Sequence, residues 1–137
     1  MKRTIPVFAV LAAIALALPA SHAQTLTGAQ AQKSPQAEVF LAYEKALIWQ
    51  GIDAASPYMT PERLAGMKDM LKQLGAESFK QMQIEKRKSV LQGEARRRQI
   101  EKVVVDGDNA VVEARSGPND VDVARLVRMK DGWKIGK

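Results

Sequence analysis

The sequence predicts an α+β domain in which N-terminal helices pack on one face of an antiparallel sheet. Three observations lead to this prediction. Apolar residues recur at helical spacing from about residue 35 to about residue 91. β-Branched residues dominate from residue 100 to residue 135, and clusters of Gly, Asp, Asn and Pro interrupt them three times. Helices therefore precede a meander of short strands.

The chain begins with the pattern of a cleavable signal peptide. Lys2 and Arg3 are followed by an uncharged, largely apolar stretch from Ile5 to Leu18, and Ser21 and Ala23 place small residues before a predicted cut. An uncleaved membrane anchor is the alternative, but the apolar run is shorter than the roughly 20 residues that a spanning helix needs. We expect residues 1–23 to be removed and the protein to be periplasmic or secreted by a bacterium.

Cleavage would also limit the chemistry of the protein. The only histidine is His22, and the chain has no cysteine, so residues 24–137 contain neither. Zinc, copper and haem sites, disulfides, lipid anchoring through cysteine, and catalysis by Ser-His or Cys-His pairs are therefore not expected. We predict no metal, no cofactor and no stable membrane anchor. The remaining 114 of 137 residues carry 19 basic and 15 acidic side chains, a net charge of +4.

The expected domain extends over residues 34–137. Residues 24–33 are polar, small and aperiodic, and they predict a flexible linker. Ser34-Pro35 has the composition of a helix start, Phe40, Tyr43 and Leu47 follow at helical spacing, and Gly51 ends the pattern. Asp53 is expected to cap a short turn over residues 54–58.

Two further helices are expected before the strands. Thr60-Pro61 repeats the start signal, and an apolar stripe ends at Gly75. A third helix is expected from Ala76 to about Leu91, although the boundary between this helix and the first strand stays open within residues 84–98. The apolar stripe of the second helix consists of Leu64, Met67, Leu71 and Leu74.

Four strands complete the prediction. The run from Ile100 to Val105 meets the turn signal of residues 106–109, and residues 110–114 form the return strand. Residues 116–119 form a second turn, Val121 to Met129 the third strand, residues 130–132 the last turn, and Trp133 to Ile135 the final strand. We expect Trp133 to lie in the core.

Three stretches of the sequence resemble the nuclear transport factor 2-like superfamily. They are the helix of residues 37–47 leading into Gly-Ile-Asp-Ala-Ala at 51–55, the hairpin of residues 103–112, and the final hairpin of residues 126–135 ending in Trp-Lys-Ile. The resemblance implies a cone-shaped α+β fold with a curved antiparallel sheet. It is nearest to small exported bacterial domains with no assigned function, although many of those carry the anchoring cysteine that this chain lacks. Enzymatic relatives of the ketosteroid isomerase type place acids, tyrosines or histidines inside the cone, and a fold alone does not transfer such an activity.

Aromatic residues on or near the first helix suggest a pocket. Tyr43, Trp49 and Tyr58 could line the mouth of the cone with Asp53 beside them, and such walls bind small apolar ligands. The alternative is ordinary core packing for the aromatic rings and helix capping for Asp53. The aspartates of residues 106–108 lack the ligand spacing of a calcium loop, so they predict no metal site.

The charges are uneven in one region. A cluster of basic residues could bind an anionic partner, or it could be a solvated helix end and a strand edge protected against pairing. No aromatic residue interleaves the cluster, which argues against nucleic acid. Its members are Lys86, Arg87, Lys88, Arg96, Arg97 and Arg98.

These observations leave three functional hypotheses. The preferred one is an exported, non-catalytic module that binds a small apolar ligand or a protein partner, with a homodimer formed through the sheet as a further expectation. The second is a small isomerase or hydratase that uses Asp53 with Tyr43 or Tyr58. The third is an envelope-associated interaction protein that docks through the basic cluster.

Overall fold

The computed structural model of the chain describes residues 23–92 and 99–137. It confirms the predicted α+β class, because a group of helices packs on an antiparallel sheet and precedes four of its five strands. Residues 1–22, with nearly all of the predicted signal peptide, lie outside the described part. Arg96, Arg97 and Arg98 also lie outside it.

The helical part follows the predicted start signals. Ser34 caps the long helix α3, because its hydroxyl accepts a hydrogen bond from the backbone N–H of Ala37 (3.2 Å). Thr60 caps α5 in the same way, through the N–H of Arg63 (3.2 Å). These are the serine and threonine caps that the sequence indicated. The elements are α2 (Gly28–Gln32), α3 (Pro35–Trp49), α4 (Ile52–Ala55), the short 3-10 helix η2 (Ser56–Tyr58), α5 (Pro61–Leu74) and α6 (Ala76–Gln92).

The sheet is an antiparallel meander in which each strand pairs with the next in the chain. The predicted turns join β2 to β3, β3 to β4, and β4 to β5, and each strand is slightly longer than the sequence indicated. The third predicted helix extends to Gln92, so the boundary that the sequence left open falls after that residue. The strands are β1 (Gln24–Thr27), β2 (Gln99–Asp106), β3 (Asn109–Gly117), β4 (Asp120–Met129) and β5 (Gly132–Ile135).

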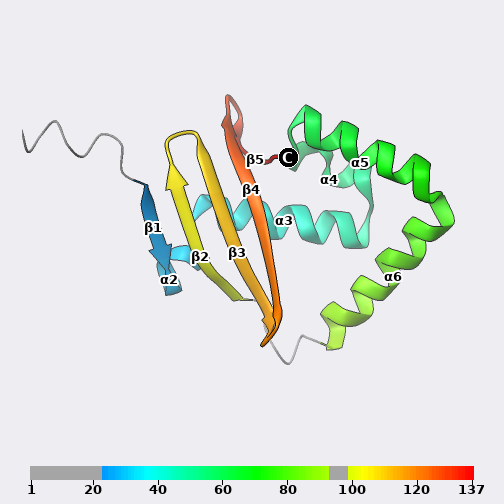
Figure 1. Cartoon of the computed structure of the whole chain (residues 1–137), viewed down its shortest axis with the longest axis horizontal. Helices are drawn as coiled ribbons and strands as arrows, with labels where there is room; N and C mark the ends of the chain where they lie inside the picture. The colour runs from blue at the N-terminus through cyan, green and yellow to red at the C-terminus, as the bar shows by residue number, and fades with distance from the viewer. Residues whose placement is uncertain (1–22, 93–98) are drawn as a thin grey trace, which may run out of the picture.

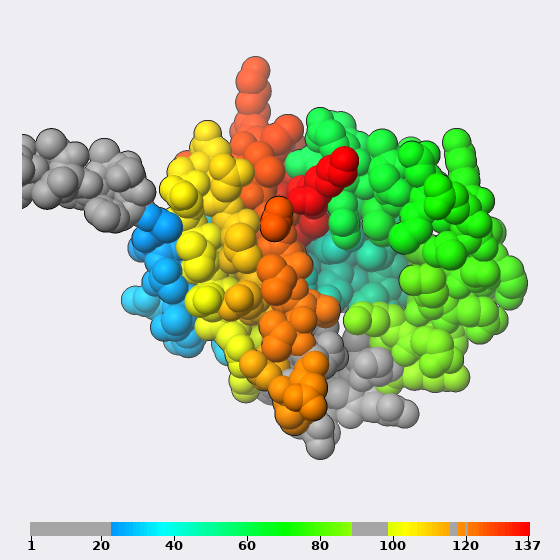
Figure 2. All heavy atoms as spheres, viewed as in Figure 1, coloured from blue at the N-terminus to red at the C-terminus, as the bar shows by residue number. Residues whose placement is uncertain are grey.

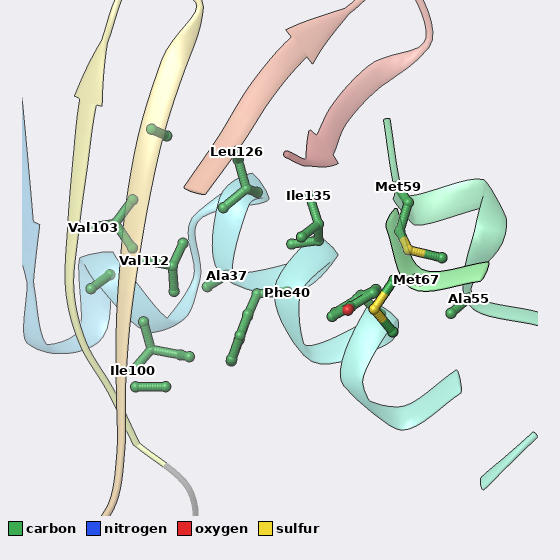
Figure 3. Close-up of a cluster of buried hydrophobic side chains, with 14 of the residues drawn as sticks. Ala37, Phe40, Ala55, Met59, Met67, Ile100, Val103, Val112, Leu126 and Ile135 are labelled. Carbon is green, nitrogen blue, oxygen red and sulfur yellow. The ribbon is translucent and has the colours of Figure 1, made fainter. Parts of the chain in front are cut away.

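The core lies between α3 and the inner face of the sheet. Figure 3 shows Val103, Val112 and Leu126 directed from three adjacent strands toward Phe40 on α3. The three strand residues are at most 1 % exposed. The core continues past the sheet, where Ile135, Met59 and Met67 surround the middle of α3 (Figure 3). Trp133 is only half-buried at the margin of this core, and the Arg128 guanidinium lies 4.9 Å from its ring centre.

Helix α3 extends past the sheet (Figure 1). It crosses behind the strands and continues beyond β4, where α5 and α6 form an arm beside its second half (Figure 1). This arm is thinly packed, because Leu74 and Met82 are 44 % and 51 % exposed. α5 and α6 are separated by Gly75, whose φ of 86° is a backbone conformation that glycine adopts readily.

Residues 24–33 do not form the flexible linker that their composition indicated. Residues 24–27 are strand β1, paired with residues 102–105 of β2, and residues 28–32 form α2. The strand depends on pairing with β2 rather than on its own propensity, which is why composition missed it. Leu26 and the fully buried Ala31 attach the segment to the core, and the Ser34 hydroxyl donates a hydrogen bond to the Ala31 carbonyl (2.7 Å).

Removal of this segment should therefore destabilise the domain. A chain of residues 34–137 loses the β1–β2 hydrogen bonds and the burial of Ala31, so we expect its free energy of unfolding to fall by at least about 2 kcal/mol relative to residues 24–137. Urea denaturation followed by circular dichroism measures the difference. Equal stability of the two chains would restore the linker interpretation.

The β4–β5 turn is fixed by Lys134. Its ammonium group lies 2.9 Å from a carboxylate oxygen of Asp131 and donates to the carbonyl of Pro57 in η2. The hydrogen bond from Lys134, with a backbone hydrogen bond, lowers the pKa of the exposed Asp131 carboxyl. Since the folded pKa is depressed, the stabilisation is present above the unfolded pKa of Asp131 and is lost as pH falls through the folded value.

This arrangement predicts the titration of one carboxyl group. Lys134→Met should raise the pKa of Asp131 toward its usual value, and Lys130→Met, a change of the same charge in the same turn, should leave it in place. Carbon-detected NMR of the Asp131 side chain measures both pKa values. Equal shifts in the two variants would rule out the specific Lys134 contact.

Candidate functional site

A groove in the described part of the chain lies between α3 and the first half of β4. It has a volume of about 510 Å³. Figure 2 shows the hollow between β4 and the α5–α6 arm, with α3 at its floor. The groove is lined by Phe40, Tyr43, Glu44, Arg63, Asp122, Val123, Ala124, Arg125, Ile135, Gly136 and Lys137.

The floor of the groove is apolar and rigidly held. Phe40 and Tyr43 lie on successive turns of α3 and are 4 % and 7 % exposed, and Ile135 of β5 is 2 % exposed. Ala124 adds a small side chain from β4 that leaves room above the aromatic rings. These residues belong to the main core, so the groove is an opening onto the core rather than a surface depression.

Two hydrogen bonds of Thr60 place Arg63 beside the groove. The backbone N–H of Thr60 donates to the Ile135 carbonyl (2.9 Å), which docks the start of α5 on the end of β5. The Thr60 hydroxyl then caps the N–H of Arg63. The Arg63 guanidinium consequently lies beside α3, where Nη2 donates to the Tyr43 hydroxyl at a long 3.4 Å. Its Nε is buried and has no hydrogen-bond partner among the described residues.

Charged groups form the rim of the groove. Arg125 and Lys137 contribute cations from the β4 and C-terminal sides, and Glu44 contributes a carboxylate from α3. Asp122 is a second carboxylate, and the ammonium group of Lys86 on α6 lies 4.0 Å from it. This pair links the far end of the arm to the sheet and partly compensates the charge of Asp122.

A second, smaller pocket lies at the other end of α3. It has a volume of about 380 Å³ and is formed by α4, α5 and the start of α6. Its apolar wall is made by Ile52, Leu71 and Phe79. Its remaining lining residues are Gln50, Asp53, Lys68 and Lys72.

The structure does not bring the four predicted pocket residues together. Tyr43 lines the groove, Asp53 lines the second pocket, and Trp49 and Tyr58 line neither. Trp49 is 43 % exposed and stacks against Arg87, while Tyr58 is half-buried in η2 and packs against the core. Neither of these two pockets therefore contains the predicted set, and on α3 the helix itself separates Tyr43 in its middle from Trp49 at its C-terminal end.

Asp53 does not cap the helix as the sequence suggested. The residue that caps α4 is Gly51, and Asp53 lies inside the first turn of the helix with an exposed side chain. A general base of the isomerase type would need Asp53 and a tyrosine hydroxyl within reach of one substrate atom. The two side chains line different pockets, so this arrangement does not support the isomerase hypothesis.

The basic cluster divides into separate contacts. Arg87 holds α6 against the C-terminal end of α3, because its Nε donates to the Ile48 carbonyl (2.9 Å) and its Nη2 to the Trp49 carbonyl (3.1 Å). Its guanidinium also lies 5.3 Å from the Trp49 ring centre. Lys88 pairs with Glu85 (3.6 Å), and Lys86 with Asp122. The described members thus have structural partners, and Arg96 to Arg98 fall outside the described residues.

Residues that sequence reasoning missed make up most of the groove. The only sequence feature that relates Arg63 to the groove is its position three residues after Thr60, at the start of a helix. Arg125 and Ala124 lie in a strand whose sequence carries no signal of a site. This part of β4 is an edge of the sheet because β5 ends opposite Leu126. Within residues 23–92 and 99–137, no group of three or more His, Cys, Asp or Glu side chains is placed to hold a metal ion.

Comparison with known proteins finds no matching family model, no matching curated protein and no matching solved structure. Among the helices that the structure describes, none has the length and hydropathy needed to span a membrane.

The contact between Arg87 and α3 predicts a difference between neighbouring basic residues. Arg87→Met removes two charge-assisted hydrogen bonds to helix-end carbonyls, and we expect it to lower the free energy of unfolding by about 1.5 kcal/mol. Lys88→Met, one position away and exposed, should change it by less than about 0.5 kcal/mol. Urea denaturation of both variants provides the comparison. Equal effects would show that Arg87 is a solvated surface residue that does not stabilise the contact with α3.

Proposed function

We propose that this protein is an exported, non-catalytic binding module, and that the groove between α3 and β4 is its ligand or partner site. The observation that carries the proposal is the pairing of an apolar floor with a polar rim. Phe40, Tyr43 and Ala124 offer apolar contact beside the cations Arg63 and Arg125. Binding sites typically combine such a surface with a few polar groups that fix orientation, and 510 Å³ lies within their usual size range.

The state of Arg63 supports the same proposal. Its weak contact with Tyr43 and the unpaired Nε leave hydrogen-bonding capacity at the groove wall. A buried donor without an acceptor costs about 1–3 kcal/mol, and a ligand oxygen beside the guanidinium would recover part of it. The occupant that fits is an elongated molecule with an apolar body and an acidic or carbonyl group directed toward Arg63 and Arg125.

Export is part of the proposal and rests on the sequence of residues 1–23. The absence of His and Cys from residues 24–137 also supports binding over catalysis, because any acid–base chemistry would depend on Asp, Glu, Lys or Tyr. Membership of the nuclear transport factor 2-like superfamily, whose members use the interior of the fold for ligands, is likewise a proposal based on the three resembling stretches.

A small probe tests the groove directly. 3-Phenylpropionate carries an aromatic ring and a carboxylate, and we expect it to shift the amide NMR signals of groove residues with a millimolar Kd, which corresponds to about −4 kcal/mol. Arg125→Glu should weaken this binding at least about fivefold, since it reverses a rim charge. Lys130→Glu makes the same charge change in the β4–β5 turn, outside the groove, and should preserve the affinity.

Two results would contradict the proposal. One is the absence of any saturable shift in the groove, and the other is an equal loss of affinity in the two charge-reversal variants. Shifts confined to Ile52, Leu71 and Phe79 would instead assign binding to the second pocket.

A further inference from the structure

The edge of β4 beside the groove has backbone groups that pair with no strand among the described residues. The N–H of Gly136 donates to the carbonyl of Arg125 (2.7 Å), so the backbone of Arg125 faces the β5 side of the strand. The N–H of Arg128 donates to the carbonyl of Asp108 (2.7 Å), so even-numbered residues face β3. Residues alternate along a regular antiparallel strand, and the β3–β4 pairing has no irregularity between Val121 and Val127. Val121 and Val123 therefore direct N–H and C=O groups toward the groove side.

No described strand pairs with this part of the edge. β5 begins opposite Met129 and ends opposite Leu126, so it stops before Val123. The last residue of β5 is covered in turn, because Thr60 donates to the Ile135 carbonyl and Met59 forms a bridge with Ile135. The fold thus covers the end of β5 with its own chain, and the adjoining edge of β4 faces the groove.

The side chains along this edge favour pairing. Val121 and Val123 are 42 % and 59 % exposed, and β-branched residues are typical of paired strands. Natural edge strands are usually protected by charged side chains, proline or a bulge, and from Val121 to Ala124 the one such feature is Asp122, whose charge is partly compensated by Lys86. An exposed apolar edge of this kind is a template for another strand.

The groove has the place that an added strand would take. A neighbouring strand lies about 4.8 Å from its partner in the plane of the sheet. On the groove side of β4 that position falls within the groove, whose lining includes Val123 on β4, Tyr43 on the floor and Arg63 on α5. A segment of four or five residues, about 15 Å long at the rise of a strand, would continue the sheet over the part of α3 that β5 leaves uncovered.

We propose that the partner of the groove is an acidic, extended peptide segment that pairs with the Val121–Val123 edge of β4 as an additional strand. This inference rests on the proposed function and identifies its occupant. The acidic character follows from the lining of the groove, where the basic residues Arg63, Arg125 and Lys137 outnumber the carboxylates of Glu44 and Asp122, and the Lys86 ammonium group lies 4.0 Å from Asp122. Strand addition derives affinity from backbone hydrogen bonds and specificity from alternate side chains.

Backbone methylation distinguishes strand pairing from other binding in the groove. The probe is a capped hexapeptide of sequence Thr-Glu-Val-Thr-Val-Glu, titrated into the protein and followed by amide NMR and calorimetry. Two further peptides carry N-methyl groups, one at positions 2 and 4 and the other at positions 3 and 5. Only one set of alternate N–H groups can face β4, so one methylated peptide should lose at least about tenfold in affinity and the other should retain it. Equal affinities of the two methylated peptides would overturn the proposal.

Two substitutions at one residue test the edge itself. Val123→Pro removes the N–H that faces the groove without removing a hydrogen bond to β3, and it should weaken the unmethylated peptide about tenfold. Val123→Thr keeps the shape and the N–H and should bind normally. Unchanged binding to a folded Val123→Pro protein contradicts strand pairing, and the methylated peptides decide the question should this variant not fold.

The remaining outcomes separate this inference from the proposed function. Binding of 3-phenylpropionate without binding of any peptide overturns the inference and leaves the groove a small-molecule site. Failure of both probes contradicts both proposals. A concentration-dependent dimer that Val123→Pro abolishes would show that a second copy of the chain occupies the edge, and would also overturn the peptide assignment.

Discussion

The structure depends on the packing of α3 against two different partners. Its 15 residues extend for about 22 Å, and the first turns lie under the sheet while the last turns lie beside the α5–α6 arm. Phe40 belongs to the sheet side, and the carbonyls of Ile48 and Trp49 are held by Arg87 of α6. Between these two covers the middle of α3, near Tyr43, faces an opening. The groove is thus a consequence of one helix supporting two layers that are joined at Thr60–Ile135 and Lys86–Asp122 and leave the middle of α3 open between them.

The local elements were largely predictable because their signals are local. Ser34-Pro35 and Thr60-Pro61 start helices through hydrogen bonds that span only three residues, and the Asp-Gly-Asp-Asn turn joins two β-branched runs that form the expected hairpin. Strand β1 was missed for the opposite reason. Its polar residues become a strand only because β2, about 80 positions away in the chain, offers a matching edge. Composition contains no record of such a partner.

The site was less predictable than the fold. Tyr43 was identified as a pocket residue from its place on α3, but its neighbours Arg63, Ala124 and Arg125 come from α5 and β4 and share no motif. The length of β5 decides which part of β4 is an edge, and the docking of Thr60 on Ile135 decides where Arg63 points. Both features depend on tertiary structure, which local sequence patterns do not indicate. The expectation that histidine and cysteine chemistry is absent, in contrast, rests only on the composition and on the predicted signal cut.

Amide hydrogen exchange along β4 tests the central claim most directly, because the claim concerns single backbone groups. With no peptide present, the N–H groups of Asp122 and Ala124 face β3 and should exchange slowly, whereas those of Val121 and Val123 face the open groove and should exchange much faster. Protection should return at Val127, where β5 covers the same edge. Alternating rates that become uniformly slow after Arg125 would support an open strand edge beside α3. Equally slow exchange at all four residues from 121 to 124 would show that the edge is already occupied and would contradict the account.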